Sequence, residues 1–291
     1  MSTSSLTAAE TDAADAIIRL ALAEDLGTTG DRTSLATIPE TTRAKAAFVA
    51  RSVGVVAGLP VAERVCRAIS ADLAFVQAVP DGTATERGTL LATISGPLRA
   101  VLAAERTALN FLQRLSGVAT LTRRYVDAAR GFPAQVLDTR KTTPGWRLLE
   151  KYAVRAGGGT NHRIGLFDGI LIKDNHIAGL LGDVGKSVEA ARNYPGNAGL
   201  PVEVEVDTLE QLEHALAVKA DIALLDNMTL DQLRLAIDRR NEVNPATLLE
   251  ASGNVNLTTI RDIAATGVDR ISVGALTHSA PALDIGLDYT A

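Results

Sequence analysis

The residues best suited to bind a small anion lie together between Asp138 and His176. This segment holds seven Lys or Arg, two of the four histidines and only four carboxylates, inside a chain whose formal net charge is −5. Cations gathered in one place against the overall charge indicate a small anion that is held locally. An extended polyanion would need basic residues spread over a whole surface, so nucleic acid is not the expected partner.

Two pairs of neighbouring cations stand out within the segment. Arg140 and Lys141 follow a short apolar stretch and are flanked by hydroxyl side chains, while His162 and Arg163 follow a run of three glycines. Arg offers a planar fork for a carboxylate or phosphate, and Lys offers a mobile point charge. The glycine run permits close backbone approach to a ligand, but no GK[ST] follows it, so it is not the phosphate loop of nucleotide triphosphatases.

Lys173 ends the apolar sequence GILIK, where a lysine could bind an anion or form a Schiff base with a carbonyl substrate. Glu203 and Glu205 alternate along one predicted strand and therefore share a face, and Asp226 ends the next strand. Carboxylates on neighbouring strands can hold Mg²⁺, directly or through water, or the hydroxyls of a ribose. Either glutamate could instead be the partner of Lys173.

The elements that must position these residues repeat from Gln135 onward. Strands with polar C-terminal tips alternate with helices, which indicates parallel strands joined by right-handed crossovers. Six units are visible, fewer than the eight of a complete barrel. An incomplete barrel is favoured over a doubly wound sheet because nearly every strand has a polar tip, whereas a doubly wound sheet concentrates them at one switch point. The last two tips, at 252–254 and 273–275, have the glycines typical of a phosphate site.

The first part of the chain is predicted to be a separate α+β unit. Helices are expected over 12–25, 60–70 and 98–116, with short strands between 43 and 97 and a boundary near Gly117. Arg106 and Arg114 lie on the long third helix, where solvent exposure is the simplest expectation. The single cysteine, Cys66, excludes an intrachain disulfide and is expected in the core.

Composition predicts an ordinary cytoplasmic globular protein. Hydrophobic residues make up 46% of the chain, and the pI is about 5.5. The N-terminus has neither the basic nor the apolar region of a secretory signal. No apolar run approaches the roughly 18 residues of a membrane span. We therefore expect neither a membrane nor a nucleic-acid partner.

Long segments of the chain resemble one enzyme family. The related positions are AERTALNFLQRLSGVAT, the whole of Asp138–His176, VEVEVDTLEQ, LLDNM and EASGNVNLTTI, within a similarity that extends from EDLGTTGDRTS to LTHSAPALDIGL. These segments resemble quinolinate phosphoribosyltransferases, the decarboxylating nicotinate-nucleotide pyrophosphorylases of NAD biosynthesis, with no departure at the charged positions. The related nicotinate phosphoribosyltransferases take a monocarboxylate and are not expected to carry this segment.

The resemblance implies an α/β fold with two domains. Residues 1–116 would form an N-terminal α/β sandwich, with 277–291 packing back on it, and residues 117–276 an incomplete (open) α/β barrel of the type II phosphoribosyltransferase kind. It also implies a homodimer in which Arg106 is donated across the interface to the neighbour's site.

The resemblance further implies a role for each site residue. Arg140, His162, Arg163 and Lys173 would bind the two carboxylates of quinolinate, with Lys141 near the phosphoribosyl donor. Glu205 and Asp226 would serve the ribose hydroxyls and Mg²⁺, and the group taken as catalytic is Lys141, Lys173, Glu205 and Asp226. Ser252, Gly253, Asn254 and Gly274 would bind the 5′-phosphate, with His278 as a nearby polar contact. Whether Glu203 joins the site or only supports Lys173 stays open.

The implied reaction transfers a phosphoribosyl group from phosphoribosyl pyrophosphate to the ring nitrogen of quinolinate. Loss of CO₂ then gives nicotinate mononucleotide, and the positive ring nitrogen stabilises the carbanion, so no organic cofactor is expected. Two other classes remain open from the residues: a Schiff-base lyase that uses Lys173, and a related barrel that only binds an anion.

Overall fold

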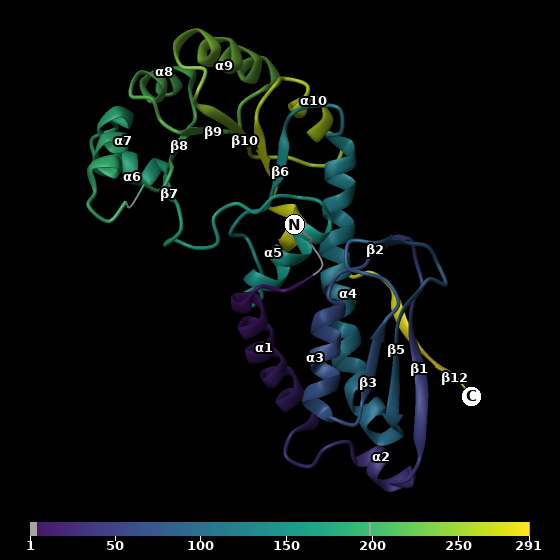
Figure 1. Ribbon diagram of the computed structural model, residues 1–291. Helices are drawn as coiled ribbons and strands as arrows, with labels where there is room; N and C mark the ends of the chain where they lie inside the picture. The colour runs from purple at the N-terminus through teal and green to yellow at the C-terminus, as the bar shows by residue number, and fades with distance from the viewer. Residues whose placement is uncertain (1–4, 198, 291) are drawn as a thin grey trace. The chain divides into compact units, whose positions relative to one another are not determined.

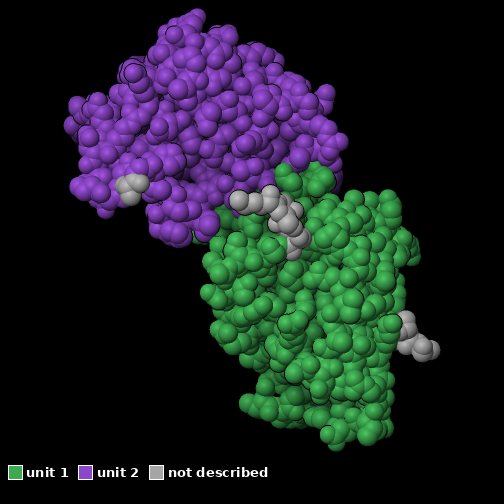
Figure 2. Space-filling model, viewed as in Figure 1, with its two compact units in different colours: residues 1–123, 142–158, 276–291 green, residues 124–141, 159–275 purple. Residues whose placement is uncertain are grey.

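The computed structural model of the chain describes residues 5–197 and 199–290. Two compact units are present: unit 1 comprises residues 1–123, 142–158 and 276–291, and unit 2 comprises 124–141 and 159–275 (Figure 2). Each unit is described by itself below. No helix within the described ranges is long and apolar enough to cross a membrane.

Unit 1 is built on a four-stranded antiparallel sheet in the order β12-β1-β5-β3 (Figure 1). Its strands are β1 (Arg43–Ala50), β3 (Ala74–Gln77), β5 (Leu90–Pro97) and β12 (Ile285–Thr290), and β2 (Gly54–Val55) pairs with β4 (Ala84–Thr85). Side chains of β1 alternate, so that Ala46, Phe48 and Ala50 are buried on one face. The C-terminal strand β12 pairs with β1 over six residues, which makes the end of the chain part of this unit.

Helices complete unit 1: α1 (Ala8–Leu26), α2 (Arg32–Thr37), α3 (Leu59–Ile69), most of α4 (Leu98–Ala128) and α5 (Arg147–Ala156). Thr7 and Glu10 form a capping box that starts α1. The Asp81 carboxylate accepts the first backbone N–H groups of α3 and the Tyr152 hydroxyl, and burial raises its pKa.

The long helix α4 continues well past the predicted end at residue 116. Gly117 lies inside it, where the segment at Pro281 passes so closely that a Cβ on this glycine would meet the Pro281 carbonyl oxygen at 2.1 Å. The close approach of Pro281 explains the glycine at this position, while the division into compact units falls within α4 at Arg123–Arg124.

Helix α5 belongs to unit 1 by its contacts, because it packs against α1 there. Arg155 donates to Glu10 at 2.7 Å, and the buried Glu150 accepts from Arg114 at 2.6 Å. The simple expectation of a solvent-exposed Arg114 is wrong, since Arg114 also donates to the backbone carbonyls of Ala280 and Thr277.

Unit 2 contains six parallel strands in the order β6-β11-β10-β9-β8-β7 (Figure 1). They are β6 (Gln135–Leu137), β7 (Ile170–Ile172), β8 (Val202–Val206), β9 (Ile222–Asp226), β10 (Leu248–Ser252) and β11 (Arg270–Ser272). The first strand, β6, pairs with the last, β11, as in a barrel, while β6 and β7 form the two ends of the order. The incomplete barrel is thus confirmed, and the doubly wound alternative is wrong because the order contains no switch point.

Helices follow the strands of unit 2: α6 (Asp174–Gly179), α7 (Val184–Asn193), α8 (Leu209–Ala217), α9 (Leu230–Val243), α10 (Ile260–Ala264) and, across the unit boundary, α11 (Ala275–His278). Thr208 and Thr229 cap α8 and α9 through capping boxes. In β8 the buried Val202, Val204 and Val206 occupy one face, toward α7 and α8. The two glutamates of β8 therefore occupy the opposite face, inside the barrel.

Candidate active site

A pocket of about 320 Å³ lies at the C-terminal ends of the unit 2 strands. Because parallel strands all end at the same edge, the polar tips that are distant in sequence meet there. All of its lining residues belong to unit 2: Thr139, Arg140, Lys141, His162, Arg163, Leu171, Lys173, Glu205, Leu224, Asp226, Glu250, Ser252 and Ser272.

Eight residues predicted from the sequence lie around this pocket: Arg140, Lys141, His162, Arg163, Lys173, Glu205, Asp226 and Ser252. Gly253 and Asn254 directly follow Ser252, and Gly274 follows β11 in unit 2. Arg106 and His278 belong to unit 1. Arg106 lines a separate pocket of about 280 Å³ there, beside α1 and Trp146, and His278 Nδ1 lies 2.6 Å from Ser279 Oγ.

Two guanidinium groups share one side of the pocket. The pKa of Arg163 is lowered, first because the side chain is partly buried and second because the Arg140 charge is near. Arg163 Nη1 donates to the Gly169 carbonyl at 3.1 Å, which holds the guanidinium in place. Two like charges brought together in a pocket produce a strong local field for an anion with more than one negative charge.

Lys173 pairs with Glu205, so Glu205 is the glutamate beside this lysine. The pair bridges the end of β7 to the neighbouring strand β8. An ion pair stabilises the ammonium form of lysine, whereas a Schiff-base lysine must present an unprotonated amine. The geometry therefore favours the charged, anion-binding role of Lys173 over the Schiff-base alternative.

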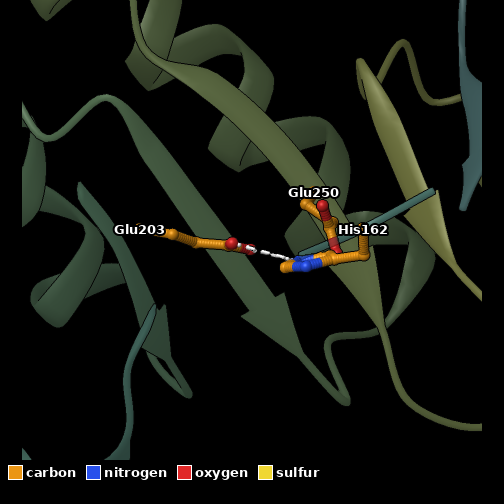
Figure 3. A group of neighbouring side chains, drawn as sticks. All are labelled: His162, Glu203 and Glu250. Carbon is orange, nitrogen blue, oxygen red and sulfur yellow. Dashed lines mark hydrogen bonds and ion pairs between the residues drawn. The ribbon is translucent and has the colours of Figure 1, made fainter. Parts of the chain in front are cut away.

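Glu203 lies deeper in the barrel, where it forms a buried group with His162 and Glu250 (Figure 3). His162 Nε2 is 3.1 Å from Glu203 Oε2 and 3.5 Å from Glu250 Oε1. Burial acts to lower the pKa of His162, but the hydrogen bond to Glu203 and the charges of both glutamates outweigh it and raise the pKa.

Arg270 adds a fourth charged side chain to this buried group, with Nε 2.9 Å from Glu250 Oε2. Glu250 is fully buried, and its pKa is raised to about 7, chiefly by burial and then by the negative charge of Glu203. Glu250 and Arg270 were not predicted from the sequence. The available signal was a carboxylate in the middle of the apolar strand LLEAS, two residues before Ser252 and hence on the same face.

The strand tips on the other side of the pocket carry oxygen and amide groups. Asp226 pairs in register with Ser252, and Asn227 Nδ2 donates to the Asp226 carboxylate at 2.7 Å. Asn254 Nδ2 donates to Asn227 Oδ1 at 3.1 Å. Gly253 has φ +92°, and a Cβ there would meet Asn227 Oδ1 at 2.2 Å, so only glycine fits between the two tips.

Two glycines of the run 157–159 serve packing within unit 1. A Cβ on Gly157 would lie 2.5 Å from the Ala119 carbonyl oxygen of α4, and Gly158 has φ +92°. The structure therefore explains both glycines without the ligand contact that the sequence analysis considered.

Comparisons with known proteins identify the same protein family for the N-terminal and the C-terminal parts of the chain. A family model described as the C-terminal domain of quinolinate phosphoribosyl transferase matches residues 118–288, and the model of the N-terminal domain matches residues 31–116. A Mycobacterium leprae protein named nicotinate-nucleotide pyrophosphorylase [carboxylating] is 47% identical over 282 residues, which cover 96% of this chain and 98% of the relative. Quinolinate phosphoribosyltransferase [decarboxylating] 1 of Nicotiana glauca is 43% identical, over 93% of this chain and 81% of that protein.

Solved structures of known proteins are also similar to this chain. The nicotinate-nucleotide pyrophosphorylase of Francisella tularensis superposes with a TM-score of 0.89 at 39% identity and covers 96% of both chains. NadC from Streptococcus pyogenes has a TM-score of 0.89 at 42% identity, over 95% of this chain and 97% of that one.

Proposed function

This chain belongs to the quinolinate phosphoribosyltransferase family, and we propose that it transfers the phosphoribosyl group of phosphoribosyl pyrophosphate to quinolinate with loss of CO₂. The products are nicotinate mononucleotide, pyrophosphate and CO₂, within NAD biosynthesis. The observation that best supports this reaction is the pocket of unit 2, where Arg140, Arg163 and Lys173 meet the carboxylates of Glu205 and Asp226.

Quinolinate carries two adjacent carboxylates on a flat ring. The guanidinium groups of Arg140 and Arg163 can each donate two parallel hydrogen bonds to a carboxylate, and Lys173 adds a third cation at the end of β7. Leu171 and Leu224 supply apolar surface for the ring between these charges. We assign His162 to the same subsite and Lys141 to the phosphoribosyl donor.

The donor would occupy the acidic side of the pocket. Glu205 and Asp226 can accept the ribose hydroxyls, while Ser252 and the backbone amides around Gly253 can donate to the 5′-phosphate. Asn254 and Gly274 extend that loop region, and His278 is assigned to a nearby polar contact.

Mg²⁺ fits the donor set, because Glu205 and Asp226 provide hard carboxylate oxygens from the neighbouring strands β8 and β9. Bound there, directly or through water, the ion would offset the negative charge of the departing pyrophosphate. The Lys173–Glu205 ion pair leaves the second oxygen of Glu205 for a ribose hydroxyl or a metal-bound water.

The residues of the pocket act mainly by positioning and by electrostatics. The quinolinate nitrogen attacks the anomeric carbon as the bond to pyrophosphate breaks, and positive charge develops on the sugar as in glycoside cleavage. The anchored carboxylates orient the ring nitrogen toward that carbon, which lowers the entropic cost of the encounter. The quaternised ring nitrogen then accepts the electron pair left by CO₂, so no general base is needed.

We also propose a cytoplasmic homodimer in which Arg106 of one subunit completes the quinolinate site of its partner. Arg106 supports this role by lining an open pocket of unit 1.

The direct test is incubation of the chain with quinolinate, phosphoribosyl pyrophosphate and Mg²⁺ while CO₂ and nicotinate mononucleotide are followed. Stoichiometric formation of both products is expected. Binding of quinolinate without either product would overturn the proposal and support the barrel that only binds an anion.

A further inference from the structure

The Glu250–Arg270 pair lies at the buried end of the pocket, where Glu250 is one of the lining residues, and it has no part in the reaction described above. Glu250 is fully buried on β10, and Arg270 approaches it from β11. Burying an ion pair costs desolvation energy that an apolar pair would not incur. The presence of a buried ion pair is therefore weak evidence that the pair stabilises the fold. The pair is therefore a candidate for a specific function.

Both ring nitrogens of His162 are engaged inside the protein. The backbone N–H of Arg163 donates to Nδ1 at 2.7 Å. A nitrogen that accepts a hydrogen bond carries no proton, so the proton of the neutral ring is on Nε2, the atom that faces Glu203 at 3.1 Å and Glu250 at 3.5 Å. The two carboxylates thus match the tautomer that the Arg163 amide requires.

The opposite tautomer would place two donors against each other. With the proton on Nδ1, the Nδ1–H donor would point at the N–H donor of Arg163. The Nε2 lone pair would then point at the two carboxylates, which are also acceptors. The backbone at His162 is held from its other side, because the Asp138 carboxylate accepts the His162 N–H at 2.8 Å. The His162–Arg163 turn can therefore adopt this geometry only with Nε2 protonated.

We propose that Glu250 is a positioning residue, which acts with Arg270 to hold His162 in the Nε2–H tautomer and thereby fixes the His162–Arg163 turn that presents the Arg163 guanidinium to the substrate carboxylates. This inference depends on the proposed function for the identity of that substrate. The chain of contacts runs from Arg270 through Glu250 and His162 to the Arg163 amide. None of its steps requires a contact between Glu250 and the substrate.

Arg270 has a defined part in this arrangement. Two carboxylates beside one imidazole favour a second proton on the ring, which would go to Nδ1 and break the contact with the Arg163 amide. The positive charge of Arg270 opposes that protonation in part, while the pKa of His162 is still raised on balance by the two glutamates. The charged groups that face His162 are Glu203 from β8, Glu250 from β10, Arg270 from β11 and the neighbouring Arg163.

The test compares Glu250→Gln with the unmodified protein in steady-state kinetics and in NMR of ¹⁵N-labelled histidine. The chain has four histidines, and His162→Asn identifies the signal of interest. A second variant, Glu250→Met with Arg270→Met, removes both partners together and avoids leaving a buried charge unpaired. Arg240→Met is the matched control, because it breaks another largely buried ion pair of unit 2, with Asp269 at 2.8 Å, whose residues do not line the pocket.

We expect both Glu250 variants to raise the KM for quinolinate on the order of tenfold or more, since small misplacement of a binding group has effects of that size. The KM for phosphoribosyl pyrophosphate should stay within about threefold. In spectra recorded at increasing pH, up to the point where the His162 signals stop changing and the ring is neutral, those signals should shift from the Nε2–H tautomer in the unmodified protein toward a mixture in the variants. Arg240→Met should change neither KM nor the His162 signals.

An unchanged His162 tautomer, or a quinolinate KM that moves no more than in Arg240→Met, would overturn the inference. Failure of the proposed function looks different. In that case the unmodified protein would not consume quinolinate at all, while the NMR measurement would still show whether Glu250 selects the tautomer.

Discussion

Replacement of Glu250 by glutamine should remove a pH dependence of stability that the native protein carries. The pKa of Glu250 is raised from its ordinary value of 4.5 to about 7 by burial and by the charge of Glu203. A carboxyl group with a raised pKa binds its proton more tightly in the folded state than in the unfolded state. Its contribution to stability is therefore fully present below about pH 4.5 and is lost as the pH rises toward 7.

The size of the pH dependence follows from the difference between the ordinary pKa of Glu250 and its raised pKa in the folded protein. Each pH unit between the two pKa values is worth about 1.4 kcal/mol, so the native protein should lose about 3 kcal/mol of unfolding free energy from this group. His162 acts in the same direction, because its pKa is also raised and its contribution is lost as the pH rises through that value. Glutamine resembles the protonated carboxyl and cannot titrate, so the variant should show a much flatter curve.

The assay must report on unit 2. The only tryptophan, Trp146, lies in unit 1, so its fluorescence does not follow the strands around Glu250. Native-state hydrogen exchange of the backbone amides of β10 and β11 measures the opening free energy there directly. We would compare the native protein and Glu250→Gln from pH 5 to pH 8.

Parallel curves for the two proteins would refute the reasoning. That result would mean that Glu250 is already ionised in the folded protein and that Arg270, at 2.9 Å, fully offsets its burial. A flatter curve in Arg240→Met, the control pair, would equally show that the effect does not belong to Glu250.

Four further predictions concern the proposed activity. Lys173→Ala and Arg140→Ala should each lower kcat/KM for quinolinate by about 10- to 150-fold or more, the value of one charge-assisted hydrogen bond, with unchanged circular dichroism; near-normal kcat/KM in either would contradict the assignment. Borohydride should trap no adduct at Lys173 under saturating substrate, and a trapped adduct would restore the Schiff-base alternative. Gly253→Ala should raise the KM for phosphoribosyl pyrophosphate more than that for quinolinate, because a Cβ would meet Asn227 at 2.2 Å; equal kinetics to the native protein would rule out a tight loop. Mixing Arg106→Ala with Lys173→Ala, each of low activity alone, should raise the activity through hybrid dimers that retain one intact site, and no increase after subunit exchange would argue against donation of Arg106 across the interface.

The sequence alone was sufficient to predict the parallel-strand unit and most of its pocket. Polar tips follow apolar strands at regular intervals, and parallel strands bring such tips to one edge whatever the details of the loops. For this reason Arg140, Lys173 and Asp226, far apart in the chain, could be expected around one mouth. The family could be predicted from the sequence as well, because few other protein families contain such long charged segments.

Packing between segments that are distant in the chain could not be predicted from the sequence in the same way. The predicted helix end at residue 116 is an example, because α4 continues through Gly117, a glycine that the close approach of the chain at Pro281 requires. Helix α5 joins unit 1 through contacts with α1, and no local pattern in residues 147–156 records that partner.

The strand tips, their charges and the family could thus be predicted from residue types and from a repeat that is local along the chain. Which carboxylate serves which cation depends instead on contacts between strands. Glu205 pairs with Lys173, while Glu203 and Glu250 face His162. Alternation along a strand predicts that two glutamates share a face, but the depth of each in the barrel, and the partner it meets there, depends on strands that come from other parts of the chain.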